Sequence, residues 1–329
     1  MEEMRLQDMK GFRIGSSENL EAGTGCTVIL CDKPSPCSVD VRGGGPASRE
    51  SELLNPVAAC DSIHAVVLSG GSAYGLDAAG GVMQYLEEHG VGLPVGDAIV
   101  PLVVQACIFD LECGQNIRPD KEMGYEACVH AEGNPTVKEG NFGVGTGATV
   151  GKLLGEAYMT KAGLGTFAVR LGELEVGAIV AVNALGDVVD EEGDVLAGLR
   201  NPNGEGFMSS RMMMLEHSDE MMKILSGAAN ATTNTTIGAV VTNGKFNKTE
   251  LKKIAALASN GVVRAISPVN TTADGDSIFA LSVGEVASDA NLAGVACAYA
   301  MEQAIRRAIR AAEGAYGVPA LRDVKSSKN

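Results

Sequence analysis

The sequence predicts an α/β fold. Short apolar runs with the composition of buried strands alternate along the chain with stretches of helical periodicity, and 42 glycines supply tight turns between them. Of the 329 residues, 45% are hydrophobic and 20% are charged, so the chain can bury a large core and is not expected to be disordered. Such a length suits one large domain or two ordinary ones.

Strands and a helix alternate in the first third of the chain. GCTVILC and SIHAVVLS are typical of buried strands, and a helical pattern follows the second run, with Ser72 near its start and Gly90 as a stop. A further strand comes next. The expected elements are strands over Gly25–Cys31 and Ser62–Ser69, a helix over Tyr74–His89 and a strand over Ile99–Phe109.

The later part of the chain predicts an antiparallel pair of strands, a loop with a short Met-rich helix, and a polar segment that leads into another strand. A helix, a strand and a long helix follow. The last helix is rich in Ala and Gly, which allows a close approach to a neighbouring layer. In order, the ranges are Ala157–Arg170, Glu175–Asn183, Asn201–Ser226, Gly227–Asn234, Thr235–Thr242, Asn247–Ala258, Ser277–Val283 and Ser288–Ala312.

Charge and composition argue against several classes of protein. The formal net charge is −15 and there is no basic stripe, which argues against nucleic-acid binding and against an anionic membrane surface. The N-terminal MEEMRLQDMK lacks the apolar stretch of a secretory signal, and no apolar run reaches the roughly 18 residues of a membrane span, so we expect a cytoplasmic protein. Eight scattered cysteines without a CxxC pair are then expected to be reduced and mostly buried.

Two glycine-rich segments invite comparison with ligand-binding loops. GVGTGATVGK fails as a phosphate loop, because Thr146 stands at a required glycine and Leu153 at a required Ser or Thr. SGGSAYGLDAAGG, with Ser72 and Tyr74, is either a tight turn beside a small-residue helix face or one wall of a ligand pocket made by backbone N–H groups. The four histidines show no zinc-ligand spacing, so no metal site is expected.

The segment TTADGDS places Asp274 and Asp276 on either side of a glycine, just before an expected buried strand. In an extended segment, side chains two residues apart point the same way, so both carboxylates can face one site. Carboxylates at the end of a loop are also commonly solvated or act as caps. The motif alone leaves both interpretations open.

The Asn234–Thr235 junction has a more specific chemical interpretation. A threonine at a chain N-terminus carries its own base, the α-amine, whose pKa is about 8. An internal threonine gains that amine when its hydroxyl attacks the preceding carbonyl and water hydrolyses the resulting ester. The polar segment before Thr235 and the strand after it offer the flexible approach and the rigid support that this reaction needs. Polar loops also enter buried strands in proteins without this chemistry.

The segment NTTIGAVVTN, followed by DGD, resembles the DmpA family of self-processing hydrolases, which comprises L-aminopeptidase/D-esterases, β-peptidyl aminopeptidases and nylon-oligomer hydrolases. GCTVIL, VDVRGGGPASRE, SGGSAYGLDAAGGV, IFDL with RPDKEMGYEA, and GVGTGATVGK are similar to family segments in the same order, so the resemblance covers essentially the whole chain. It implies a single domain with a four-layer α/β/β/α sandwich, of the type shared with ornithine acetyltransferases, and no metal or organic cofactor.

The resemblance also implies roles for individual residues. Cleavage at Asn234–Thr235 would give chains 1–234 and 235–329, with Thr235 as the nucleophile. Lys152 matches the lysine of the family, and Asn183 matches the asparagine that helps to hold the oxyanion.

The remaining matches concern two carboxylates and one departure. Asp274 and Asp276 match an acidic or hydroxyl pair that would orient the nucleophile, balance nearby positive charge and bind a substrate's ammonium group. Phe109 stands where the family has a tyrosine near the oxyanion, so either Tyr74 or a backbone N–H of the glycine-rich turn supplies the missing donor, or the enzyme is slow on ordinary peptides. We therefore expect Phe109, Ser72 and Tyr74 to line the substrate pocket.

The expected function is hydrolysis of amide or ester bonds in small amino-bearing peptides and related substrates. Two alternatives remain: an acyltransferase of the ornithine acetyltransferase type, or a catalytically weak binding member of the fold, which Phe109 favours. The resemblance further implies a homo-oligomer, a tetramer of cleaved units. The helix over Ser288–Ala312 agrees with this, because it has small residues on more faces than one core contact needs.

Overall fold

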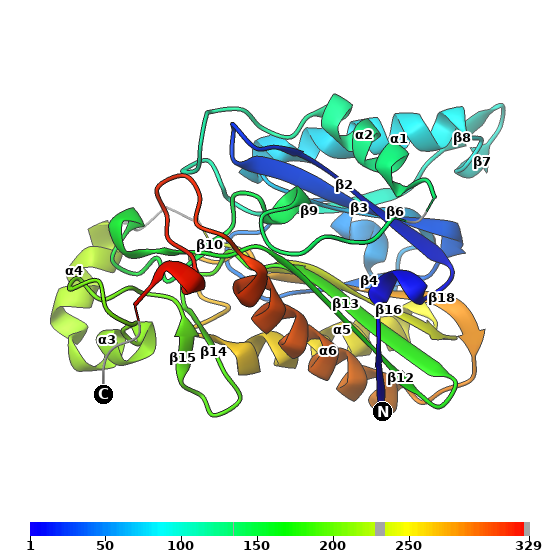
Figure 1. The fold of residues 1–329 in the computed structure, drawn as a ribbon. Coiled ribbons are helices and arrows are strands. Elements are labelled where there is room, and N and C mark those ends of the chain that lie inside the picture. The colour runs from blue at the N-terminus through cyan, green and yellow to red at the C-terminus, as the bar shows by residue number, and fades with distance from the viewer. Residues whose placement is uncertain (134, 228–233, 326–329) are drawn as a thin grey trace.

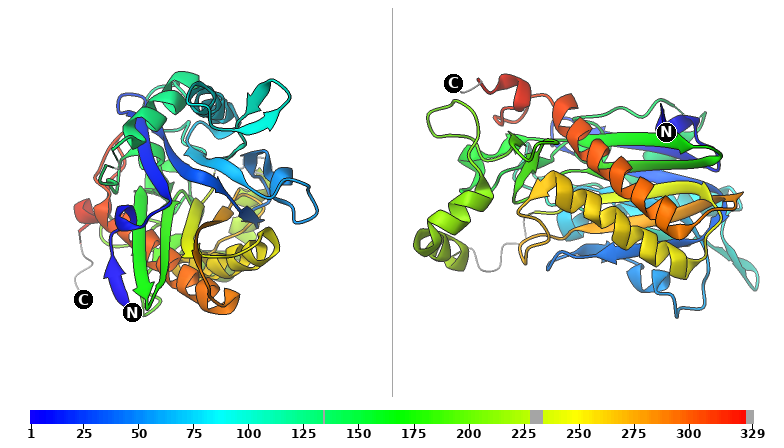
Figure 2. Two further views of the ribbon diagram at one scale, coloured as in Figure 1. Left: turned by 90° about the vertical axis from the view of Figure 1, so that its right-hand side faces the viewer. Right: turned by 90° about the horizontal axis from the view of Figure 1, so that it is seen from below.

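The structure, a computed structural model that describes residues 1–133, 135–227 and 234–325, has four layers (Figures 1 and 2). Two β-sheets lie face to face in the centre, and each has a pair of helices on its outer face. This confirms the expected α/β/β/α sandwich. The helices are α1 (Ala78–Glu88) and α2 (Lys121–Ala131) on one side, and α5 (Lys248–Ala265) and α6 (Ala290–Ala311) on the other.

Both sheets are mixed. The first has the strand order β2-β3-β6-β9-β5, and the second has the order β1-β12-β13-β16-β18-β4. Strand β16 pairs in parallel with β18 on one side and antiparallel with β13 on the other. The first sheet contains β2 (Phe12–Asn19), β3 (Thr24–Ser35), β5 (Ala47–Arg49), β6 (Ile63–Ser69) and β9 (Val103–Cys107). The second contains β1 (Glu2–Met4), β4 (Cys37–Val41), β12 (Leu164–Leu171), β13 (Leu174–Ala181), β16 (Ile237–Gly244) and β18 (Ser277–Val286).

Smaller elements surround the sandwich, with β10, β14, β15, α3 and α4 gathered at one end of it (Figure 1). Within the described ranges no helix is both long and apolar enough to cross a membrane. The smaller elements are β7 (Leu93–Val95), β8 (Ala98–Val100), β10 (Thr149–Val150), β11 (Thr160–Lys161), β14 (Asp187–Val189), β15 (Val195–Ala197), β17 (Ile266–Ser267), α3 (Ser210–Glu216) and α4 (Ser218–Gly227).

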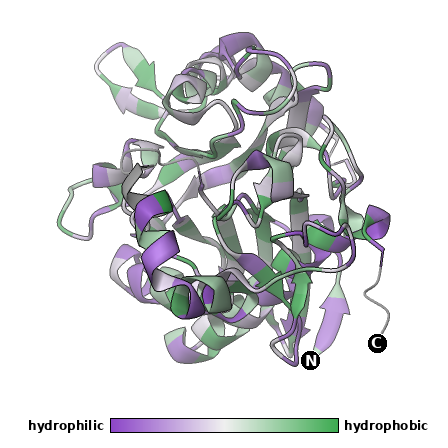
Figure 3. Ribbon diagram, turned by 90° about the vertical axis from the view of Figure 1, so that its left-hand side faces the viewer, coloured by the Kyte–Doolittle hydropathy of each residue, from purple (hydrophilic) through white to green (hydrophobic). Residues whose placement is uncertain are grey.

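The apolar run in β3 is continuous because this strand is buried on both faces. Val28 and Leu30 belong to the core beneath α1 and α2, whereas Ile29 and Cys31 belong to the larger core between the two sheets. Alternate residues of a strand point to opposite faces, so a strand between two layers needs apolar residues at every position. In Figure 3 much of the central strands is accordingly green, the colour of hydrophobic residues.

Helix α6 lies very close to its neighbours, as its Ala and Gly content predicts. A Cβ atom on Gly165 of β12 would lie 2.0 Å from the carbonyl oxygen of Ala304, and one on Gly261 of α5 would lie 2.1 Å from that of Ala298. Real Cβ contacts are never so short, so only glycine fits at these two positions. The small residues thus allow backbone-to-backbone packing of α6 against both a strand and a helix.

Several expected elements differ in the structure. One short helix was expected within Asn201–Ser226, where the structure has α3 and α4, and the helix expected to end at Ala258 runs to Ala265. The strand expected from Thr235 begins at Ile237, and the polar segment expected over Gly227–Asn234 lies mostly outside the described residues.

The helix predicted over Tyr74–His89 becomes α-helical only at Ala78, because the chain first forms a tight 3₁₀ turn in which a Cβ on Gly75 would lie 1.8 Å from the Gly70 carbonyl oxygen. The strand predicted over Ile99–Phe109 is divided into β8 and β9 around Pro101, which has no N–H for a ladder. The strand predicted over Ala157–Arg170 begins only at Leu164.

Candidate active site

Thr235 lies two residues before the start of β16, and its hydroxyl donates to the carbonyl oxygen of Asn234. The N–H of Thr235 donates to the backbone carbonyl of Asn183 at 2.7 Å, and the N–H of Gly275 donates to the Asn234 carbonyl at 2.8 Å. Thr235 is only 4% exposed. The hydroxyl that would attack, the carbonyl that would be attacked and a donor for that carbonyl oxygen are therefore held together in the intact chain.

Gly275, in the middle of the DGD motif, lies so close to Thr235 that a side chain would not fit. A Cβ atom at this position would lie 2.8 Å from the Oγ1 atom of Thr235 and 2.8 Å from the carbonyl oxygen of Gly45. Its role comes from its N–H and from the close approach that only a residue without a side chain permits. The sequence shows the glycine but not the atoms that lie beside it.

Asn183 is the centre of the polar network beside Thr235. It lies just after β13, fully buried. Its Oδ1 accepts a hydrogen bond from Lys152 Nζ at 2.7 Å and from the N–H of Thr149 at 3.1 Å, while its Nδ2 donates to the carbonyl of Phe109 at 2.8 Å. Donors on one side and an acceptor on the other fix which way the amide points. Thr149 was missed by the sequence analysis, although it stands three residues before Lys152 in the GVGTGATVGK segment.

The Lys152 ammonium group is buried among carboxylates. Its pKa is lowered from the usual lysine value mainly by burial, and the negative charge of Glu112 is the strongest influence in the opposite direction. Lys152 as a whole is 8% exposed. A lysine in such surroundings gives up its proton more readily than a solvated one, which suits a group that accepts a proton during catalysis.

Asp274 and Asp276 both lie beside the nucleophile, but each carboxylate is held by backbone N–H groups. Asp276 accepts from Thr236 at 2.6 Å and from Asn270 at 3.0 Å. Asp274 accepts from the N–H of Thr271 at 2.8 Å and from its hydroxyl at 2.6 Å. Burial, and then the negative charge of Asp274, raises the pKa of Asp276 to about 7. Asp276 thus holds the backbone N–H directly after Thr235, and both carboxylates fix the loop that precedes β18.

The three expected pocket residues occupy different places. Phe109 contributes its backbone carbonyl to the Asn183 amide. Ser72 has a left-handed backbone with φ of 53° in the glycine-rich turn, and its N–H donates to the carbonyl of Ile108 at 2.8 Å. Tyr74 is 62% exposed, with the guanidinium of Arg118 4.0 Å from the centre of its ring. The structure thus places Tyr74 on the outer side of the turn.

The described ranges contain no cluster of three or more His, Cys, Asp or Glu side chains that could hold a metal ion. All eight cysteines are free thiols, and seven are buried. Burial raises the pKa of the Cys107 thiol to about 12, so this cysteine is chemically inert under ordinary conditions.

The profile of peptidase family S58 matches residues 5–321. The chain belongs to peptidase family S58. An uncharacterized aminopeptidase of Mycobacterium tuberculosis is 37% identical to this S58 chain over 319 residues, which is 93% of this chain and 89% of the relative. A 6-aminohexanoate-oligomer endohydrolase of Paenarthrobacter ureafaciens is 31% identical over 285 residues, 86% of this chain and 76% of the relative.

Solved structures show the same fold. The L-aminopeptidase D-Ala-esterase/amidase of Ochrobactrum anthropi has a TM-score of 0.69 and 17% identity, and it covers 99% of this chain and 91% of its own. A Burkholderia β-aminopeptidase has a TM-score of 0.70 and 19% identity, with 97% and 91% covered. The expected resemblance is confirmed, and this S58 chain is a hydrolase of the aminopeptidase or amidase type. These findings do not favour the acyltransferase alternative.

Proposed function

We propose that this S58 hydrolase cuts itself at Asn234–Thr235 and then uses Thr235 as an N-terminal nucleophile on amide or ester bonds of small amino-bearing substrates. One observation carries the proposal: the Thr235 hydroxyl and the Gly275 N–H both meet the carbonyl oxygen of Asn234. An ordinary turn into a strand needs no such convergence on a single peptide bond.

In the self-cleavage step the Thr235 oxygen forms a bond to the carbonyl carbon of Asn234, and the hydroxyl proton passes to a base. Lys152 is our candidate for that base, because its pKa is lowered by burial and because Asn183 binds both its ammonium group and the backbone N–H of Thr235. The carbon–nitrogen bond then breaks, and the released nitrogen takes up a proton to become the α-amine of Thr235. Water hydrolyses the ester and restores the hydroxyl. Gly275 N–H lies 2.8 Å from the oxygen that becomes negative, where such a donor typically contributes about 3 kcal/mol.

For an external substrate, the new α-amine serves as the base of Thr235. The backbone carbonyl of Asn183 already accepts from this nitrogen at 2.7 Å, and it would orient the amine. Lys152, Thr149 and Phe109 fix the Asn183 amide, and we propose that its second N–H donates to the oxyanion of the substrate. Asp274 and Asp276 keep the backbone around the nucleophile in place.

The substrate class follows from the charge around Lys152 and from the relatives. Glu112 is a partly buried carboxylate close to Lys152, and its pKa is raised by burial. A substrate ammonium group would neutralise this charge without disturbing Asp274 and Asp276, which are already bonded to the backbone. The relatives named as aminopeptidases, and the one named for 6-aminohexanoate oligomers, support small substrates with a free amine.

Intact mass measurement tests the proposal. Purified wild type should give two chains that end at Asn234 and begin at Thr235. Thr235→Ala should remain one chain, and Thr235→Ser, which keeps a hydroxyl, should still be cut. Thr235→Ala that is cut at the same bond would contradict the nucleophile assignment. Wild type that is cut but hydrolyses neither aminoacyl p-nitroanilides nor small β-peptides would contradict the substrate class.

We also propose a tetramer of cleaved units in the cytoplasm. Free thiols in all eight cysteines agree with a reducing compartment. Light scattering of the purified protein tests the assembly: a mass near the 33.8 kDa of one chain at all concentrations would contradict it.

A further inference from the structure

Asp110 joins three strands of the first sheet, and neither the self-cleavage step nor the hydrolysis step described above uses it. It follows β9 and is only 3% exposed. Its Oδ1 accepts the N–H of Gly71, in the turn after β6, at 2.7 Å. Its Oδ2 accepts the hydroxyl of Thr24, the first residue of β3, at 2.7 Å. One carboxylate thus connects β3, β6 and β9 at the same end of these three neighbouring strands.

Glycines make room for this carboxylate. A Cβ atom on Gly70 would lie 1.9 Å from Asp110 Oδ2, and one on Gly147 would lie 2.6 Å from Asp110 Cβ. The glycine-rich turn after β6 is therefore built around the Asp110 side chain. The N–H of Gly71, which the sequence analysis considered for a ligand, is taken by Asp110.

The segment 108–110 connects this carboxylate to the active site. The carbonyl of Ile108 accepts the N–H of Ser72 at 2.8 Å, and the carbonyl of Phe109 accepts Nδ2 of Asn183 at 2.8 Å. The side chain of Asp110 comes next and holds Gly71. Three consecutive residues thus hold the turn on one side and the catalytic amide on the other.

We propose that Asp110 is a positioning residue of the hydrolase: its carboxylate holds the Phe109 carbonyl in register with the Asn183 amide. The inference rests on the proposed function, since Asn183 matters only if an oxyanion forms beside it. Loss of the carboxylate would let segment 108–110 shift, and the Asn183 amide would lose the acceptor that aims it. Misplacement of a catalytic group by about 1 Å can cost a hundredfold in rate.

The protonation state of Asp110 gives this role a signature. Burial raises the pKa of Asp110 to about 6, although the hydrogen bonds from Thr24 and Gly71 act in the opposite direction. A protonated carboxyl group accepts hydrogen bonds more weakly, so the positioning weakens as pH falls through this value. The ionisable groups that sense the charge of Asp110 are Lys152, Lys161, Cys107, Cys113 and Tyr316.

The test compares pH profiles of kcat for an aminoacyl p-nitroanilide. Thr24→Val removes the hydroxyl that helps to keep Asp110 ionised, so the acid limb of kcat should move to higher pH by about one unit. Thr24→Ser keeps the hydroxyl and should restore the wild-type limb. Asp110→Asn does not titrate, so it should lower kcat about tenfold at pH 8 and lack the loss of activity that ionisation of Asp110 causes near pH 6.

The rate of self-cleavage over the same pH range is the second readout, because the Asn183 amide also binds Lys152, the proposed base of that step. Self-cleavage can be measured even if wild type hydrolyses no amine-bearing substrate. That result would contradict the proposed substrate class, and the self-cleavage rates would still test the role of Asp110. If the rates of Thr24→Val fall by the same factor at every pH, the Thr24–Asp110 hydrogen bond has a purely structural role. That result, or an Asp110→Asn profile equal to wild type, would overturn the inference.

Discussion

At the scale of single residues, Gly275 decides how closely the DGD segment approaches Thr235. Gly275→Ala should push the backbone away from Thr235 Oγ1, because the added carbon would lie 2.8 Å from it. We expect self-cleavage to slow about a hundredfold, as for the misplacement of a reacting group. Gly80→Ala is the matched control, since its added carbon meets only the flexible side chain of Lys121. Electrophoresis of freshly purified protein over time measures both.

Glu112 gives a second residue-scale prediction. If its carboxylate receives the substrate's ammonium group, Glu112→Gln should lower kcat/KM for a free-amine anilide about tenfold, the effect of roughly 1.4 kcal/mol. The N-acetylated anilide has no ammonium group, so its kcat/KM should not fall. Glu156→Gln, an exposed acid nearby, is the control. Equal losses on both substrates would show that Glu112 acts on the chemistry and not on recognition.

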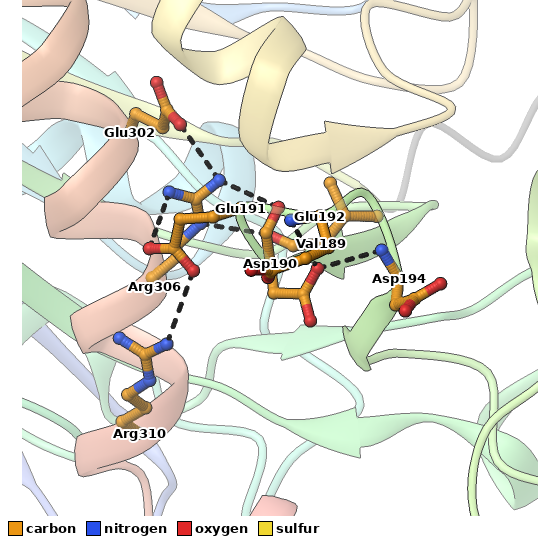
Figure 4. Close-up of polar contacts among 8 residues, drawn as sticks. All are labelled: Val189, Asp190, Glu191, Glu192, Asp194, Glu302, Arg306 and Arg310. Atoms are coloured by element: carbon orange, nitrogen blue, oxygen red, sulfur yellow. Dashed lines mark hydrogen bonds and ion pairs between the residues drawn. The ribbon is translucent and has the colours of Figure 1, made fainter.

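At the scale of elements, Arg306 ties α6 to the segment after β14 (Figure 4). Its guanidinium, 2% exposed, pairs with Glu302 at 2.9 Å and Glu191 at 3.0 Å and donates to the carbonyls of Val189 and Asp190. Arg306→Ala would leave a cavity at a buried position and would take the partner from the half-buried Glu302 carboxylate and from two carbonyls. We expect a loss of about 3 kcal/mol in the free energy of unfolding.

Arg310 offers the matched control for that measurement. It lies one turn further along α6, is 50% exposed and is 4.0 Å from Glu191. Arg310→Ala should change the free energy of unfolding by less than about 1 kcal/mol in urea titrations. Similar losses in the two variants would mean that burial of Arg306 contributes little.

The same scale shows what a sequence can predict. The apolar run of β3 identified a strand because both of its faces are buried, and β6 followed for the same reason. Helix α2 was missed: it carries charged residues and buries little more than Gly124, Ala127, Cys128 and Ala131. In the site, Lys152 and Asn183 were proposed through the family resemblance, and the structure joins them by a hydrogen bond. Gly275 acts through its backbone N–H and its close approach to Thr235, and a residue pattern does not predict either contact.

At the scale of the whole molecule, buried carboxyl groups make stability depend on pH. Burial raises the pKa of Asp187 to about 6, above the roughly 3.9 of an unfolded aspartate. The folded state therefore binds a proton at a pH where the unfolded state has lost it, and stability from this group rises as pH falls from 8 to 5.5. The gain amounts to about 1 kcal/mol.

Urea unfolding of uncut Thr235→Ala at pH 8 and 5.5 measures this effect. His64, whose pKa burial lowers, opposes it in the same window, so the comparison must isolate Asp187. Adding Asp187→Asn should remove about 1 kcal/mol of the difference between the two pH values. Adding Asp97→Asn at an exposed position should not. An unchanged difference with Asp187→Asn would contradict the assignment.

The position of β16 and β18 determines whether folding or cleavage comes first. Both strands follow Thr235, yet β16 pairs with β13 and β18 pairs with β4, strands that precede the junction. A separately synthesised C-terminal piece would be a two-stranded parallel ribbon with both edges open, which invites aggregation. The proposed cleavage therefore requires that the chain is first translated and folded as one piece, and the two products would then stay paired within one sheet. A gene divided at this junction should yield inclusion bodies from its second half.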